Sequence, residues 1–254
     1  MSAAAPAREW FADESFWRDW YPWMFPEDRF AAAAEQVDRI VELTGIGSGD
    51  VLDLCCGPGR HSIALTRRGF TVVGVDRTEF LLDKARQRAA DEGADVEWVS
   101  SDMRDFVRPS SFDLAINMFT SFGYFEHEED DLRVLRNIHE SLRPGGRFLI
   151  DVISKEYLAR VFQPTSAYED ERGNMFVQRH EIVDGWTRIR NRWVLVTGDR
   201  ARSFSFEHAV YSGGELKVRL LEAGFADVAI YGGLDGRAYD NDVQRLVAVA
   251  SKTS

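Results

Sequence analysis

The chain has 254 residues, of which 44% are hydrophobic and 29% charged, so it can bury a core and is not a disordered chain. Its 42 Asp and Glu residues outnumber 31 Lys and Arg, and the net charge of −11 disfavours nucleic acid as a partner. No run approaches the roughly 18 apolar residues of a membrane span. Residues 1–9 lack the cationic start and apolar run of a secretion signal. The sequence therefore predicts a cytoplasmic protein with no membrane partner, and it leaves the oligomeric state open.

The first 30 residues form a segment rich in aromatic side chains, which are Trp10, Phe11, Phe16, Trp17, Trp20, Tyr21, Trp23, Phe25 and Phe30. A helix is expected next, because Ala33, Val37 and Ile40 fall on one stripe. Such a segment either packs against the rest of the protein or covers a ligand.

Short apolar runs then alternate with helical stretches, which is typical of a parallel sheet covered on both faces. The predicted strands are 51–55, 70–75, 96–99, 112–117 and 147–152, with two closing strands at 228–231 and 245–250. Thr78 can cap the helix that follows the second strand. The fold class predicted is α/β, a doubly wound, mostly parallel, seven-stranded, Rossmann-like sheet formed by residues 31–153 and 212–254.

An antiparallel β insertion is predicted between the fifth and sixth strands of this sheet, at residues 154–211. Its expected strands are 168–172, 175–182, 187–196 and 202–210, separated by hairpin turns at 173–174, 184–185 and 198–199. Ser212 and Glu215 then form a capping box that opens a helix. A small sheet placed in this way is expected to act as a lid over a substrate.

A glycine turn with three acidic neighbours is the strongest functional signal. Gly57 and Gly59 lie between the first strand and the next helix, at the sheet edge where open α/β sheets bind ligands. Asp76 ends the second strand, where a carboxylate can accept both ribose hydroxyls, and Asp102 follows the third.

Two kinds of ligand, NAD and S-adenosylmethionine, could account for this glycine turn. A dinucleotide fold needs a third glycine, and the chain has Ser62 at that position. Asp53 lies four residues before the first glycine, where it would repel a pyrophosphate but attract the ammonium group of an amino acid. The pattern therefore favours S-adenosylmethionine over NAD.

The chain resembles the class I S-adenosylmethionine-dependent methyltransferases, in particular the bacterial small-molecule enzymes with an antiparallel lid insertion. The matching segments occur in family order and are 51–59, 72–76, 101–103, 112–117 and 142–148. The resemblance implies a set of cofactor-binding residues: Asp53 near the methionine amine, Gly57 and Gly59 under the methionine part, Asp76 on the ribose, Asp102 and Met103 at the adenine, and Asn117 near the sulfonium. Arg77 is also expected among the cofactor-binding residues. It also suggests that the N-terminal segment around Trp20 and Tyr21 closes over the cofactor.

The methyl acceptor is expected to be a small molecule that carries an amine or a hydroxyl. Asn117-Met118-Phe119-Thr120 stands where enzymes acting on exocyclic base nitrogens carry Asn/Asp-Pro-Pro-Tyr/Phe, and no cysteine occurs beyond Cys56 to attack cytosine. The loop 119–125 is where the fold presents residues to the acceptor. Tyr124 and His208 are candidates for orienting or deprotonating it.

Three alternatives remain: an RNA methyltransferase on the same fold, an NAD-dependent oxidoreductase and a catalytically silent cofactor-binding module. No metal site is expected, because Cys55 and Cys56 are adjacent and lack metal-ligand spacing. Both cysteines are predicted to be small buried packing residues.

Overall fold

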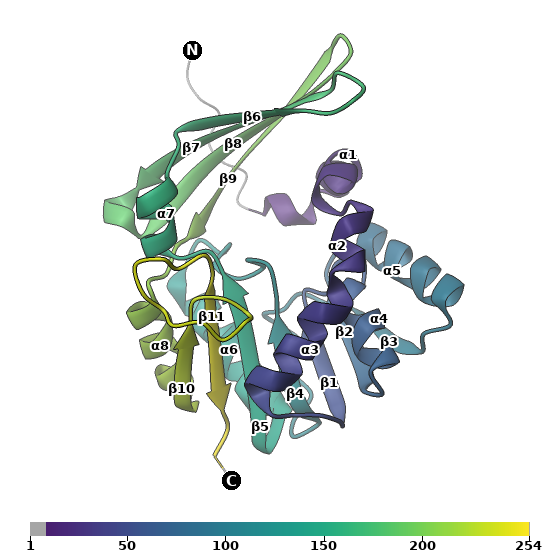
Figure 1. Ribbon diagram of the computed structural model, residues 1–254, viewed down its shortest axis with the longest axis vertical. Coiled ribbons are helices and arrows are strands. Elements are labelled where there is room, and N and C mark those ends of the chain that lie inside the picture. Colours follow the sequence, from purple (N-terminus) through teal and green to yellow (C-terminus); the bar gives the residue numbers. More distant parts are fainter. Residues whose placement is uncertain (1–8, 254) are drawn as a thin grey trace.

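The computed structural model describes residues 9–253 (Figure 1). The prediction that residues 1–9 carry no secretion signal thus falls almost entirely outside the described residues. No helix among those described is long and apolar enough to cross a membrane.

The larger of two sheets has seven strands in the order β10-β11-β5-β4-β1-β2-β3. Its strands are β1 (Asp50–Leu54), β2 (Thr71–Asp76), β3 (Val96–Ser100), β4 (Phe112–Asn117), β5 (Leu142–Val152), β10 (Ala226–Tyr231) and β11 (Leu246–Ser251). All neighbours pair in parallel except β11, which is antiparallel to both β5 and β10. The predicted doubly wound sheet is confirmed. The order reverses between β1 and β4, and ligands bind such sheets at this point.

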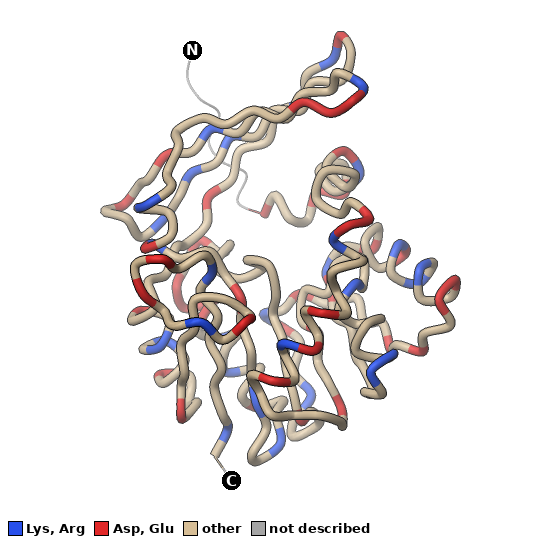
Figure 2. The backbone as a smooth tube through the Cα atoms, viewed as in Figure 1, with Lys and Arg blue, Asp and Glu red and all other residues tan. Residues whose placement is uncertain are grey.

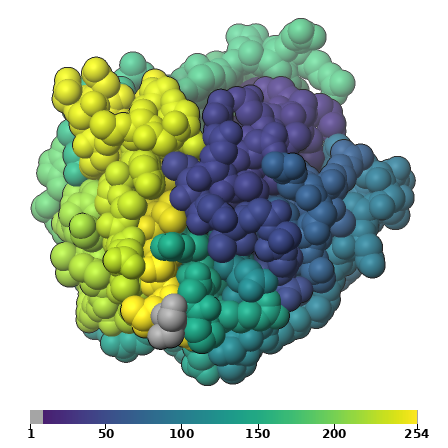
Figure 3. Space-filling model, turned by 60° about the horizontal axis from the view of Figure 1, so that its bottom comes forward, coloured from purple at the N-terminus to yellow at the C-terminus, as the bar shows by residue number. Residues whose placement is uncertain are grey.

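Helices cover both faces of this sheet. Side chains of α3 (Ala33–Thr44) and α4 (Arg60–Arg67) pack on one face, and those of α6 (Glu128–Ser141) and α8 (Gly213–Glu222) on the other. Helix α5 (Glu79–Glu92) lies along β2 and β3. Figure 3 shows the N-terminal helices beside the C-terminal part of the chain on one face of the molecule.

Of the two helix caps predicted from the sequence, one is present in the structure and the other is not. The capping box of Ser212 and Glu215 is present at the start of α8. Thr78 does occupy the N-cap of α5, but its side chain makes no capping bond. Its hydroxyl instead faces the carbonyl oxygen of Phe11 at 3.4 Å, so the predicted capping role is wrong.

The insertion forms a second sheet of four antiparallel strands in the order β6-β7-β8-β9. They are β6 (Thr165–Glu169), β7 (Met175–Val183), β8 (Arg188–Thr197) and β9 (Arg200–Ala209). The sheet arches over the N-terminal helices (Figure 1). The sequence did not indicate helix α7 (Lys155–Val161), before β6, or the short turn η2 (Asp184–Trp186).

The N-terminal segment folds into η1 (Trp10–Ala12), α1 (Glu14–Met24) and α2 (Glu27–Ala31). Its aromatic side chains pack against the insertion, in a core that contains Trp10, Phe16, Trp20, Phe176, Leu195 and Phe206. The N-terminal segment and the insertion therefore share one aromatic core above the carboxyl edge of the larger sheet.

Candidate cofactor and acceptor site

A cavity lies at the carboxyl edge of β1, β2 and β4, with about 1140 Å³ of empty space that includes its opening to solvent. Seven of the predicted site residues line it, namely Asp53, Gly57, Asp76, Arg77, Asp102, Met103 and Tyr124. The topology brings them together because parallel strands end at the same edge of the sheet.

Asp76 is held in place by the backbone around it. Its Oδ2 accepts the Gly57 N–H and its Oδ1 accepts the Thr78 N–H, both at 2.9 Å. Burial raises the pKa of this carboxyl, while the two N–H donors oppose that shift. Each oxygen keeps a further lone pair, so Asp76 can accept hydrogen bonds from a ligand's hydroxyl groups.

Asp53 is almost fully buried, with 1% of its surface exposed. The Ser62 hydroxyl donates to its Oδ2 at 2.6 Å. Burial raises the pKa of Asp53 to about 6, against the lowering effects of Ser62 and Arg60. Ser62, which stands where a dinucleotide fold carries its third glycine, therefore orients a carboxylate toward the cavity.

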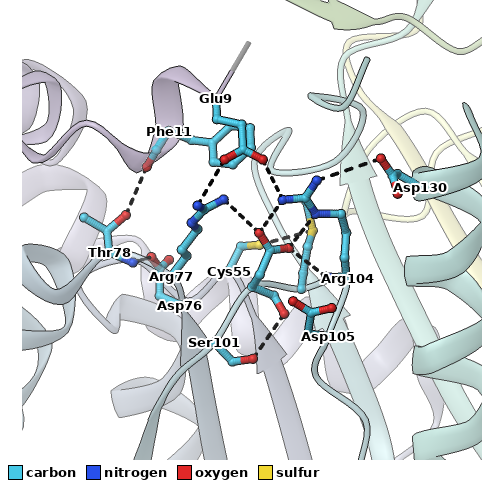
Figure 4. A network of polar contacts seen from close by, with 12 residues as sticks. Glu9, Phe11, Cys55, Asp76, Arg77, Thr78, Ser101, Arg104, Asp105 and Asp130 are labelled. Carbon is cyan, nitrogen blue, oxygen red and sulfur yellow. Dashed lines mark hydrogen bonds and ion pairs between the residues drawn. The ribbon is translucent and has the colours of Figure 1, made fainter. Parts of the chain in front are cut away.

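Figure 4 shows a network of polar contacts that includes Glu9, Arg77 and Arg104. Asp102 forms ion pairs with both of these arginines. Arg77 donates to its Oδ2 at 2.9 Å, and Arg104 donates to both of its oxygens at 3.0 and 2.8 Å. The two arginines also donate to Glu9, at 3.1 and 2.9 Å. Despite its partial burial, the pKa of Asp102 is lowered, because the hydrogen bonds and charge of Arg104 favour the carboxylate. Sequence reasoning missed Glu9, since both arginines that it pairs with are distant in the chain. It also missed Arg104, although Asp102 lies only two residues away.

The N-terminal segment contributes Trp10, Phe11 and Trp17 to the cavity wall. The carbonyl oxygen of Phe11 accepts the Trp17 indole N–H at 2.8 Å, which fixes η1 against α1. Trp20 and Tyr21, around which the segment was predicted to close over the cofactor, do not line the cavity. Trp20 is fully buried against Phe16, and Tyr21 packs on Phe25 and Phe80 outside the cavity lining.

Two other predicted cofactor residues lie behind the cavity wall. A Cβ on Gly59 would come within 2.5 Å of the Trp98 ring, so this glycine allows close packing between α4 and the sheet. Asn117 has no exposed surface and donates its side-chain amide to the carbonyl oxygen of Leu54 at 3.1 Å. Neither residue lines the cavity. Gly59 therefore serves close packing against Trp98, and the hydrogen bond of the Asn117 side chain connects β4 to β1.

The two predicted catalytic residues differ in position. Tyr124 lines the cavity, and its hydroxyl has no hydrogen-bond partner among residues 9–253. His208 does not line it. The His208 ring lies 5.0 Å from that of Tyr124, and its Nδ1 is 2.9 Å from the carbonyl oxygen of Ala209. Burial lowers the pKa of His208 to about 4, so the imidazole stays neutral near pH 7.

The loop after β4 lines the cavity with Phe119, Thr120, Ser121, Tyr124 and Phe125. Phe119 and Thr120 both have positive φ angles, 55° and 64°, which β-branched and bulky residues rarely adopt. Asp151 holds this turn by accepting the Phe119 N–H at 3.3 Å and, through its backbone oxygen, the Thr120 N–H at 2.9 Å. The sequence identified the loop but not its conformation.

The cysteines lie in the first turn after β1, and burial raises the pKa of both thiols well above the ordinary value. The sulfur of Cys55 lies 3.5 Å from that of Met103. Neutral thiols in this setting pack and do not act as nucleophiles. Across the described part of the chain, no cluster of three His, Cys, Asp or Glu residues could hold a metal ion.

S-adenosylmethionine fits the residues present. Asp53 and Asp76 are buried carboxylates whose direct bonds come only from a hydroxyl and backbone N–H groups, so an ammonium and a diol would find acceptors there. Gly57 lines the cavity with a φ of 56°, which lets a ligand approach the backbone. The strand order and the site together define the fold of class I methyltransferases.

Comparisons with known proteins give the same class. Residues 51–146 match a family model described as a methyltransferase domain. A putative methyltransferase of Bacillus subtilis, YqeM, is 30% identical over 141 residues, which are 55% of this chain and 56% of that protein. The match thus spans little more than half of that relative. The dTDP-3-amino-3,4,6-trideoxy-alpha-D-glucopyranose N,N-dimethyltransferase of Streptomyces venezuelae is 27% identical over 216 residues, 82% of this chain and 88% of that enzyme.

Among solved structures, an S-adenosylmethionine-dependent methyltransferase from Clostridium acetobutylicum superposes with a TM-score of 0.78 at 16% identity. The superposition covers 95% of this chain and 99% of the other, so the shared fold extends over the insertion. Residues 51–146 are thus a methyltransferase domain, and the chain as a whole has the fold of an S-adenosylmethionine-dependent methyltransferase.

Proposed function

We propose that the protein transfers the methyl group of S-adenosylmethionine to a nitrogen or oxygen atom of a small molecule. The observation that carries this proposal is the aromatic wall of the cavity. Trp10 and Phe11 of the N-terminal segment line it, and Trp10 packs against Phe206 of β9 with ring centroids 4.6 Å apart. An aromatic wall of this kind suits a small acceptor better than the charged backbone of a nucleic acid.

Similarity and charge support the same acceptor class. The Streptomyces venezuelae relative is named for methylating the amine of a sugar nucleotide, which is a small molecule. Lys and Arg positions are interspersed with Asp and Glu positions along the described chain (Figure 2), and the net charge of −11 disfavours a phosphate backbone as partner. An RNA acceptor is therefore the second candidate, and the assay described below tests it.

The residues that line the cavity would hold the cofactor by its polar ends. Asp76 would accept the ribose hydroxyls, and Asp53 would face the methionine ammonium. Asp102 and Met103 would lie at the adenine. When bound, S-adenosylmethionine supplies a methyl group that is already activated by a positive sulfur, so alignment of the acceptor and exclusion of water are the protein's main tasks.

At the acceptor end, Tyr124 is the side chain suited to orient the reacting group. Burial raises its pKa well above the ordinary range, so the hydroxyl stays protonated and can donate or accept one hydrogen bond. His208 supports the Tyr124 ring from outside the cavity and therefore acts as a positioning residue. An acceptor amine would lose its proton to solvent before it is enclosed.

A methyl-transfer assay with radiolabelled S-adenosylmethionine tests the proposal. The protein is incubated in parallel with pooled cell metabolites, total RNA and genomic DNA, and Asp76→Asn serves as the matched variant with weakened cofactor binding. Label that appears in the metabolite pool and is reduced with the variant, at a concentration of S-adenosylmethionine that does not saturate it, is the expected result. Label found only in nucleic acid, and lost after nuclease treatment, would overturn the small-molecule acceptor.

A further inference from the structure

The turn that follows β4 has a strained backbone. Phe119 and Thr120 are consecutive residues with φ angles of 55° and 64°, in the left-handed region that residues other than glycine rarely occupy. Both residues line the cavity. A strained conformation persists only where the surrounding structure enforces it, and such conformations are common at functional sites. The contacts that enforce this turn therefore indicate which residues control this part of the cavity wall.

Asp151, near the end of β5, makes the first set of these contacts. Only 2% of it is exposed. Its carboxylate accepts the Phe119 N–H at 3.3 Å, and its backbone oxygen accepts the Thr120 N–H at 2.9 Å. The other carboxylate oxygen accepts Arg245 Nε at 2.7 Å. A charge-assisted bond of this kind fixes the direction of the carboxylate, so Arg245 determines where Asp151 presents its acceptor to the turn.

The Thr120 hydroxyl is the second attachment of the turn. Its oxygen accepts the Ile153 N–H at 3.1 Å and Arg245 Nη2 at 3.1 Å. The guanidinium carbon of Arg245 also lies 5.5 Å from the centre of the Phe119 ring. Arg245 stands immediately before β11 and does not line the cavity itself. One side chain outside the cavity lining thus contacts both residues of the strained turn and the carboxylate that bonds to it.

The far end of the same loop is attached to the insertion. Arg188 of β8 donates to the carbonyl oxygen of Phe125 at 3.0 Å. Ser121 and Tyr124 lie between this attachment and the strained turn, and both line the cavity. The loop is therefore held at its two ends, and a shift of residues 119–120 would move Ser121 and Tyr124 within the cavity.

We propose that Arg245 is a positioning residue for methyl transfer, which holds the strained turn so that Ser121 and Tyr124 keep their places at the methyl acceptor. The guanidinium acts through Asp151 and Thr120 and does not itself reach the cavity. Alignment is a main source of rate in such a transfer, and a misplacement of about 1 Å can cost about 100-fold. This inference rests on the proposed function, which places the acceptor beside Tyr124.

Two pairs of variants test the proposal. Arg245→Gln removes the guanidinium, and Arg143→Gln is its matched control. Arg143 bonds two carboxylates at the opposite edge of the same sheet, Asp50 at 2.7 Å and Asp113 at 2.6 Å. Thr120→Val removes the hydroxyl from the turn at nearly unchanged shape, and Thr120→Ser keeps it. The second pair leaves every buried charge paired, so it decides the question even if Arg245→Gln does not fold.

Hydrogen exchange followed by mass spectrometry measures the hold on the turn without any ligand. We expect exchange in residues 118–122 to rise about 10-fold or more in Arg245→Gln and in Thr120→Val, since each loses a hydrogen bond to a charged group. The centre of β11 should keep its protection, and so should the turn in Thr120→Ser and Arg143→Gln. An unchanged turn, or an equal loss of protection in β11, would overturn the proposal.

Methyl transfer from labelled S-adenosylmethionine to pooled cell metabolites measures the consequence. Dilution of the pool separates the maximal rate from the pool concentration that gives half of it. The maximal rate should fall about 10- to 100-fold in Arg245→Gln and Thr120→Val and recover in Thr120→Ser, while calorimetry finds S-adenosylhomocysteine affinity within about 2-fold.

The outcomes separate this inference from the proposed function. Normal transfer by the unmodified protein and by Thr120→Val refutes the positioning role alone, as does a loss of rate that weaker cofactor binding accounts for entirely. An unmodified protein that labels nothing in any pool refutes the proposed function and, with it, the role in transfer. The exchange result then still decides whether Arg245 holds the turn.

Discussion

Glu9 connects the N-terminal segment to the two arginines that hold Asp102, so replacing it with glutamine is expected to loosen the cover of the cavity. The side chains of Glu9, Arg77 and Arg104 are 46%, 34% and 21% exposed. Ion pairs with this much solvent contribute about 0.2–1 kcal/mol each. Two of them together give about 1 kcal/mol, or a roughly 5-fold shift toward the uncovered state. Hydrogen bonding from Arg104 lowers the pKa of Glu9, so this carboxylate is ionised near neutral pH.

Release of S-adenosylhomocysteine, followed by tryptophan fluorescence in a stopped-flow instrument, measures this effect, because Trp10 and Trp17 line the cavity. We expect Glu9→Gln to release the nucleoside about 5-fold faster. Raising salt from about 0.1 to 1 M should accelerate release from the unmodified protein more than from the variant, since the Debye length falls from about 10 to 3 Å. Glu14→Gln is the control, because Glu14 pairs with exposed Arg18 in α1. Equal rates for Glu9→Gln and the unmodified protein would refute the reasoning.

Three further variants test the site and the core. Asp76→Asn should cost about 1.5–3 kcal/mol of S-adenosylhomocysteine affinity by calorimetry, because it removes a charged acceptor for ligand hydroxyls; full affinity would remove Asp76 from the site. Tyr124→Phe should lower methyl transfer about 10-fold or more once an acceptor is in hand, with nucleoside affinity within about 2-fold, and equal loss of both would mean that Tyr124 only packs. Asp131 carries a pKa raised to about 7 by burial, against 3.8 in the unfolded chain, so the folded state holds a proton that the unfolded state releases. The free energy of unfolding should therefore fall as the pH rises from about 4 to about 7. Asp131→Asn should reduce the difference between the urea midpoints measured at these two pH values, and an unchanged difference would contradict the pKa shift.

The residues that end parallel strands could be placed from the sequence, and the reason is topological. Asp53, Asp76 and Asp102 each follow or end an apolar run that the pattern assigns to a strand. Once those runs form one parallel sheet, their ends must meet at one edge, whatever the side-chain details. The cavity lining contains all three carboxylates.

Side-chain direction could not be predicted in the same way. Gly59 and Asn117 lie one or two residues from cavity-lining positions, yet Gly59 faces Trp98 and the Asn117 amide points to the carbonyl oxygen of Leu54. Each of these contacts joins residues far apart in the chain. The hydrogen bond from Arg60 Nη1 to the Arg29 carbonyl oxygen is equally non-local, since it depends on how α2 docks beside the start of α4. The spacing of residues along one strand or turn carries no information about such partners.

The aromatic wall above the cavity is formed jointly by the N-terminal segment and the insertion, which are far apart in the sequence. Trp10 lies between the N-terminal helices and the insertion, with ring centroids 4.6 Å from Phe206 and 5.3 Å from Tyr124. The Tyr124 ring also lies 5.0 Å from that of His208 in β9. A displacement of the four-stranded sheet would therefore shift the residue suited to orient the acceptor together with the residue that covers the cofactor site. Under the proposed function, the acceptor would bind under the insertion and the cofactor under the N-terminal segment. Both events would then depend on the same aromatic packing, so each should stabilise the other.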